Sequence, residues 1–122
     1  MTARRMAAIV GIGVIVAVTP TAWGADVQAG KQVYAKQCQN CHGSDGKGNP
    51  AIEKVLKKKI PDLTEIRLST LSKAEREKKE QEVRKAVAEG NPPMPPFGKS
   101  LSKEDQESVL EYVKKTFMEG GK

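Results

Sequence analysis

The segment that most restricts what this chain can fold into and bind spans 38–42 and reads Cys-Gln-Asn-Cys-His. This C-x-x-C-H spacing is the attachment signature of a c-type haem. If the segment is helical, Cys38, Cys41 and His42 occupy positions i, i+3 and i+4 and therefore share one face. The two thiols can then bond to the vinyl groups of one porphyrin, while the neighbouring imidazole reaches its iron. The sequence therefore predicts one covalently bound haem c, with His42 as an iron ligand.

The same cysteines could instead form a redox-active pair, a structural disulfide or half of a zinc site. A thioredoxin-like pair needs a βαβ context, and no part of the chain shows strand-like alternation. A zinc site needs about four ligands, whereas Cys38, Cys41 and His42 are the only cysteines and histidine in the chain. A disulfide fits an exported protein, although C-x-x-C pairs are typical of reactive sites.

The first 24 residues have the pattern of a secretory signal peptide. Two arginines precede an apolar run over 6–18, and Ala22-Trp23-Gly24 is a small-x-small cleavage site. The run is shorter than the roughly 20 residues that span a bilayer, so a retained membrane anchor is the less favoured alternative. We therefore expect a signal peptide over 1–24, one mature domain over 25–122, and no stable membrane insertion after cleavage.

The charge balance does not indicate a nucleic-acid partner. The chain has 21 Lys and Arg against 15 Asp and Glu, a net charge of +6. Removal of the two signal arginines lowers this charge to +4. No basic recognition helix or strand with interleaved aromatic residues accompanies the excess, so we expect no binding to nucleic acid.

The mature domain is poor in large apolar side chains. Its aromatic residues are Tyr34, Phe97, Tyr112 and Phe117. A domain of this size buries only a modest share of its surface. A large apolar prosthetic group at the centre would supply the missing core, which is a second argument for haem.

Helical periodicity and capping signals predict an all-α fold. An amphipathic helix should begin at Asp26 and lead into the attachment segment. A short helix is expected over 51–59. A capping box at Ser72 and Glu75 should begin a helix that reaches 89, with a charged and solvated first half over 73–82. A last helix should begin at Ser102, with an apolar face made of Val109, Tyr112, Val113, Thr116 and Phe117.

The stretch over 29–48, which reads AGKQVYAKQCQNCHGSDGKG, resembles the opening of a small bacterial class I cytochrome c. The resemblance covers the mature chain apart from 66–82. It implies a cytochrome c fold in which the N- and C-terminal helices cross at Gly30 and Tyr112, with short helices and loops wrapped around one haem. It also implies that a proline carbonyl accepts a hydrogen bond from the proximal histidine, and Pro50 is the match for that residue.

The stretch over 91–98, which reads NPPMPPFG, resembles the loop that carries the distal haem ligand in this family, so the resemblance assigns that role to Met94. Four prolines make the loop stiff and exclude helix and central strand. Elimination supports the assignment, because His42 is the only histidine. Met118 is the remaining rival.

A His/Met-ligated iron has no open position for a substrate, so the resemblance implies a one-electron carrier and not an enzyme. We expect a soluble, monomeric protein of the bacterial periplasm that meets redox partner proteins. Acidic partner surfaces could be steered by lysines 31, 36, 47 and 99. The alternative is a weak haem peroxidase or small-ligand sensor, should Met94 be labile.

Overall fold

The computed structural model describes residues 11, 13–14 and 25–120, and within them the chain is all-α with no named strand. The helices are α1 (Val27–Val33), α2 (Gln39–His42), α3 (Pro50–Leu56), α4 (Lys73–Glu89) and α5 (Lys103–Val113). Shorter turns are η1 (Tyr34–Cys38), η2 (Leu63–Glu65), η3 (Leu68–Thr70) and η4 (Lys114–Met118). Almost all of the expected signal peptide lies outside the described residues. No helix in the described part is long and apolar enough to cross a bilayer.

The predicted helix leading into the attachment segment is observed as α1, η1 and α2 in unbroken succession. Asp26 caps it, since its carboxylate accepts a hydrogen bond from the backbone N–H of Gln28 at 2.9 Å. The middle segment, η1, is a π-helical turn, and Cys38 is its last residue. Such turns are rare and often lie at functional sites.

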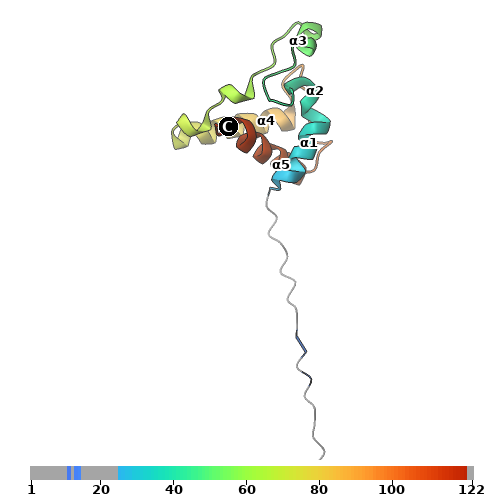
Figure 1. Cartoon of the computed structure of the whole chain (residues 1–122), viewed down its shortest axis with the longest axis vertical. Helices are drawn as coiled ribbons and strands as arrows, with labels where there is room; N and C mark the ends of the chain where they lie inside the picture. Colours follow the sequence, from blue (N-terminus) through green and yellow to red (C-terminus); the bar gives the residue numbers. More distant parts are fainter. Residues whose placement is uncertain (1–10, 12, 15–24, 121–122) are drawn as a thin grey trace, which may run out of the picture.

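Helices α1 and α5 cross at Gly30, as expected (Figure 1). A Cβ atom on residue 30 would overlap the backbone carbonyl of Ser108 and come within 2.9 Å of the Cβ of Tyr112. The hydroxyl of Ser108 also accepts a hydrogen bond from the N–H of Asp26 at 3.1 Å. The absence of a side chain at Gly30 therefore lets the two backbones touch.

The core lies where η1, α5 and η4 meet the two 3-10 turns, η2 and η3. Three aromatic rings, those of Tyr34, Tyr112 and Phe117, pack with centroids 5.3 to 5.9 Å apart. Each such pair contributes about 0.5–1.5 kcal/mol beyond its buried area. The buried members of this cluster are Tyr34, Leu63, Leu68, Val109, Val113, Phe117 and Met118.

The apolar face predicted for the last helix needs one correction. Thr116 is exposed, whereas Leu110 and Met118, which the prediction left out, are buried. Leu110 lies within α5 and simply extends its apolar face. The exchange of Thr116 for Met118 is caused by η4, a second π-helical turn, which continues α5 over Lys114–Met118. A π turn holds an extra residue, so the face that meets the core shifts along the sequence after Val113.

Helix α4 begins and ends where the sequence predicts. Ser72 and Glu75 form both hydrogen bonds of the capping box, and Gly90 follows the last helical residue. No residue of α4 is fully buried, in keeping with its charged composition. Two ion pairs tie it to α5 and η4: Arg84 with Glu107 at 2.8 Å, and Glu80 with Lys114 at 3.2 Å.

The short helix predicted over 51–59 is observed as α3, which begins one residue earlier and ends three residues earlier. Asn49 caps it through its side chain, and Pro50 takes the first helical position. Lys57 adopts a left-handed conformation with φ of 52°, which ends the helix before the lysine run is complete. Helix α3 stands apart from the crossing of α1 and α5, at the top of Figure 1.

Candidate functional site

Cys38, Cys41 and His42 lie within five residues at the end of the first helical stretch and are all half-buried. Both thiols are free, so no disulfide joins them. Burial raises the pKa of the Cys38 thiol to about 11, and the nearby Cys41 adds to the effect. The neutral thiol form is therefore the one that the folded chain favours at position 38.

The glycine-rich loop after His42 folds back onto the attachment helix. The N–H of Gly48 donates to the carbonyl of His42 at 2.8 Å, and the N–H of Asn49 donates to that of Cys41 at 2.9 Å. The phenol of Tyr34 donates to the carbonyl of Gly43 at 2.6 Å. These bonds satisfy the carbonyls at the helix end and hold the backbone of His42 in place.

The imidazole of His42 is the chemically distinctive group of the site. Its Nδ1 atom is buried and has no hydrogen-bond partner of good geometry among the described residues. Burial lowers the pKa of His42, while the backbone carbonyl of Pro61 acts in the opposite direction. A buried polar atom without a partner costs about 1–3 kcal/mol and calls for an explanation. A ligating histidine normally uses one nitrogen for the metal and gives its other N–H to a fixed acceptor.

The expectation that Pro50 accepts a hydrogen bond from His42 stays a prediction. Pro50 is the first residue of α3, while the backbone of a second proline, Pro61, raises the pKa of His42 against the effect of burial. Pro61 is therefore a second candidate for the histidine's acceptor. Pro61 lies in the turn before η2, where Asp62 caps the turn by accepting from the N–H of Thr64 at 2.8 Å.

Met94 lies in a loop that is anchored at several points. Met94 and Asn91 exchange two backbone hydrogen bonds, at 2.8 and 3.1 Å. Further along, the N–H of Phe97 donates to the carbonyl of Val87 at 2.8 Å, and Phe97 is buried. The loop is thus pinned to the end of α4, and its central methionine is half-buried.

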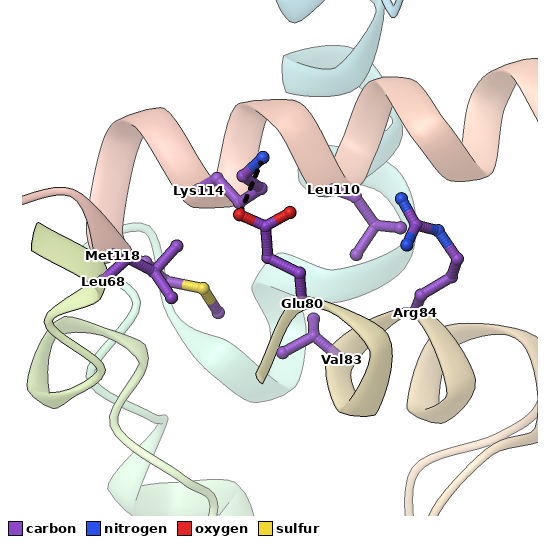
Figure 2. Close-up of a pocket in the computed structure, with 7 residues that line it drawn as sticks. All are labelled: Leu68, Glu80, Val83, Arg84, Leu110, Lys114 and Met118. Atoms are coloured by element: carbon purple, nitrogen blue, oxygen red, sulfur yellow. Dashed lines mark ion pairs between the residues drawn. The ribbon is translucent and has the colours of Figure 1, made fainter. Parts of the chain in front are cut away.

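Met118 has a different environment. It is 1% exposed and belongs to the core cluster. Figure 2 shows its thioether beside Leu68, in a small pocket between α4 and η4 that the Glu80–Lys114 ion pair covers. Met118 therefore serves as packing between helices.

These residues fit a haem. Two free thiols and a buried imidazole nitrogen without a good partner lie side by side. On α3, the apolar side chains of Val55 and Leu56 are exposed, at 77% and 39%, and are available for contact with an apolar group.

Comparisons with known proteins decide the family. A family model described as cytochrome C oxidase, cbb3-type, subunit III matches residues 25–113. Cytochrome c6 of Gracilaria tenuistipitata var. liui is 34% identical over 91 residues, which covers 75% of this chain and 73% of the relative. Cytochrome c6 of Rippkaea orientalis is 35% identical over 99 residues, covering 80% and 78%. The chain belongs to the class I cytochromes c. This cytochrome is thus an electron-transfer protein of the monohaem type and binds haem c covalently.

The fold of this cytochrome agrees with a solved structure, the KustC0563 c-type cytochrome. That likeness has a TM-score of 0.51 at 24% identity and covers 69% of this chain and 92% of the other. A 28-residue stretch is also 57% identical to thiosulfate dehydrogenase of Stutzerimonas stutzeri, but it covers only 9% of that enzyme. A match of that extent carries no activity over to this cytochrome.

Sequence reasoning missed two residues of the site. Pro61 was recognisable, because 60–64 reads Ile-Pro-Asp-Leu-Thr and resembles a turn of the cytochrome family. Lys58 had no such signal. Its ammonium donates to the carbonyl of Pro92, in the Met94 loop, at 2.7 Å. A lysine in a run of three looks like a solvated charge until its partner is known.

Proposed function

We propose that this cytochrome is an exported one-electron carrier whose haem is bound through Cys38 and Cys41 and whose iron is ligated by His42 and Met94. The observation that carries the proposal is the contrast between the two methionines of the mature chain. Met94 is held at the centre of an anchored, proline-rich loop, whereas Met118 is enclosed in the core.

The residues around His42 prepare it for this role. The hydrogen bonds from Gly48 and Asn49 hold the end of α2, and the Pro61 carbonyl acts on the imidazole ring. An acceptor on the second nitrogen fixes the tautomer and raises the basicity of the ligating one. An acceptor of this kind would orient His42 for iron binding.

When bound, the haem supplies a one-electron ferric/ferrous couple, and a methionine ligand raises its potential. If His42 and Met94 both ligated the iron, no position would be left for a substrate. The anchored Met94 loop and the hydrogen-bonded end of α2 would keep both residues in place in either oxidation state, so little would have to move when an electron arrives. These features support a carrier and not an enzyme.

The proposal includes the compartment and the partners. Cleavage after Gly24 would release a soluble, monomeric domain over 25–122 into the periplasm. Lysines 31, 36, 47 and 99 are exposed and flank the two segments that carry the ligands. They would steer redox proteins with acidic surfaces toward the haem, so transfer rates should fall as ionic strength rises.

The deciding experiment uses the purified, haem-loaded protein. We expect the ferric form to show the weak far-red charge-transfer band of a thioether–iron bond, and the reduced form not to bind carbon monoxide. Met94→Ala should lose the band and bind carbon monoxide, whereas the matched variant Met118→Leu should behave like the parent. Carbon monoxide binding by the parent would instead favour the peroxidase or ligand-sensor alternative.

A further inference from the structure

The two proposed iron ligands, His42 and Met94, come from segments that are anchored independently. His42 is held by the attachment helix and by the loop that folds back on it. The Met94 loop is held to α4, through Phe97 on Val87 at 2.8 Å and Gly98 on Ala88 at 2.9 Å. None of these bonds joins one segment to the other, so the distance between them is not fixed by either anchor.

One side chain bridges the two segments. The ammonium of Lys58 donates to the carbonyl of Pro92 at 2.7 Å, across 34 positions of sequence. Within residues 25–120 this is the only hydrogen bond between 38–61 and 91–98. Its acceptor lies two residues before Met94, on the N-terminal arm of the loop, whereas the α4 anchors of Phe97 and Gly98 hold the C-terminal arm.

The backbone around Lys58 directs it toward the loop. The start of helix α3 is held against the end of the attachment helix by Asn49. The backbone N–H of Asn49 donates to the carbonyl of Cys41, and its side-chain amide donates to the carbonyl of Asn40, both at 2.9 Å. The left-handed Lys57 then turns the chain. The next lysine, Lys59, is occupied by Glu53 at 3.3 Å, so Lys58 is the member of the run that reaches across.

We propose that Lys58 is a positioning residue that latches the Met94 loop to the His42 side of the molecule and so controls how easily an external ligand displaces Met94. This inference rests on the proposed His42 and Met94 ligation. The bond joins a charge to a neutral carbonyl at an exposed site, and a hydrogen bond there contributes a modest net stabilisation. Its loss should therefore favour loop opening by about two- to tenfold.

The test measures imidazole binding to the ferric, haem-loaded protein, because imidazole competes with Met94 for the iron. Lys58→Met keeps the length of the side chain but removes the donor, and we expect its apparent imidazole affinity to rise about two- to tenfold. Lys58→Arg retains a donor and should bind imidazole like the parent. Lys54→Met is the matched control, since Lys54 is exposed on α3 and makes no ion pair within 25–120.

The results distinguish a failure of the proposed Lys58 latch from a failure of the proposed His42 and Met94 ligation. Equal imidazole affinity in Lys58→Met and Lys54→Met would overturn the latch, even if the far-red band of the parent is intact. If Met94→Ala retains that band and binds imidazole no more tightly than the parent, the His42 and Met94 ligation fails, and the latch fails with it. An increase confined to Lys58→Met, with the Arg variant at the parent value, supports the latch.

Discussion

The backbone carbonyl of Ser108 occupies the space that a side chain at Gly30 would need. Because this contact joins the first and last helices, every residue that packs at their crossing depends on it. It also places the N-terminal end of α1 against α5, where the Ser108 hydroxyl accepts from the Asp26 N–H.

Replacing Gly30 with alanine should destabilise the protein. The new methyl group would meet backbone and not a flexible side chain, so the helices must separate, at a cost of about 1–3 kcal/mol for an overpacked core position. Denaturant unfolding followed by helical circular dichroism would measure this loss. Gln28→Ala, at an exposed position on the same helix, is the control, and a similar loss in both variants would contradict the close crossing.

Pro61 and Pro50 should differ in their effect on His42. Pro61→Ala loosens the turn that presents the carbonyl to the imidazole, so the histidine N–H should exchange faster with solvent. Pro50→Ala changes only the first position of α3 and should leave that exchange rate unchanged. Proton NMR of the haem-loaded protein would measure both rates. Faster exchange in the Pro50 variant alone would support the assignment made from the sequence.

Tyr34 should give the protein a stability that is lost in strong alkali. Burial, reinforced by Cys38 and other nearby groups, raises the pKa of its phenol well above the ordinary value. Since folding favours the protonated phenol, this stability is fully present below a pH of about 10 and is lost as pH rises through the higher folded pKa. Ultraviolet titration of the tyrosines, with parallel unfolding curves, would follow the change.

Tyr34→Phe is the control for that titration. It removes the phenol that donates to Gly43 at 2.6 Å and leaves a carbonyl without its partner, at a cost of about 1–3 kcal/mol. The alkaline loss of stability should become smaller in this variant. If the parent and the variant lose stability equally above neutral pH, the titrating group is not Tyr34.

Much of this molecule follows from local sequence signals. The Cys38–His42 spacing and the Ser72 capping box each express a short-range requirement of the backbone, and the structure shows a helix and a cap at those places. The crossing at Gly30 is a long-range contact with Ser108, and it was expected from the resemblance to the family. The helix positions were therefore accessible without coordinates, to within a few residues at α3.

The sequence is less informative where the deciding contact is distant along the chain. Pro50 and Pro61 are both candidate acceptors for His42, and the sequence does not choose between them. Lys58 is indistinguishable from its neighbours until the fold brings Pro92 to it. Thr116 was placed on the apolar face of the last helix, and Met118 was left out of it, because a period of 3.6 residues does not hold through a π turn.

The π turns also determine how the residues on either side of them are aligned around the helix axis. The turn η1, over Tyr34–Cys38, follows α1 and lies between the crossing at Gly30 and Cys41, with Cys38 as its last residue. An extra residue in a regular α-helix would rotate everything beyond it by about 100° around the helix axis, but a π turn takes one residue more than the α-helical turn that it replaces. The turn therefore absorbs the extra residue, and the attachment segment faces the side that a regular helix one residue shorter would give it. The number of residues between the crossing and Cys41 can thus change by one without changing the side on which a haem would bind.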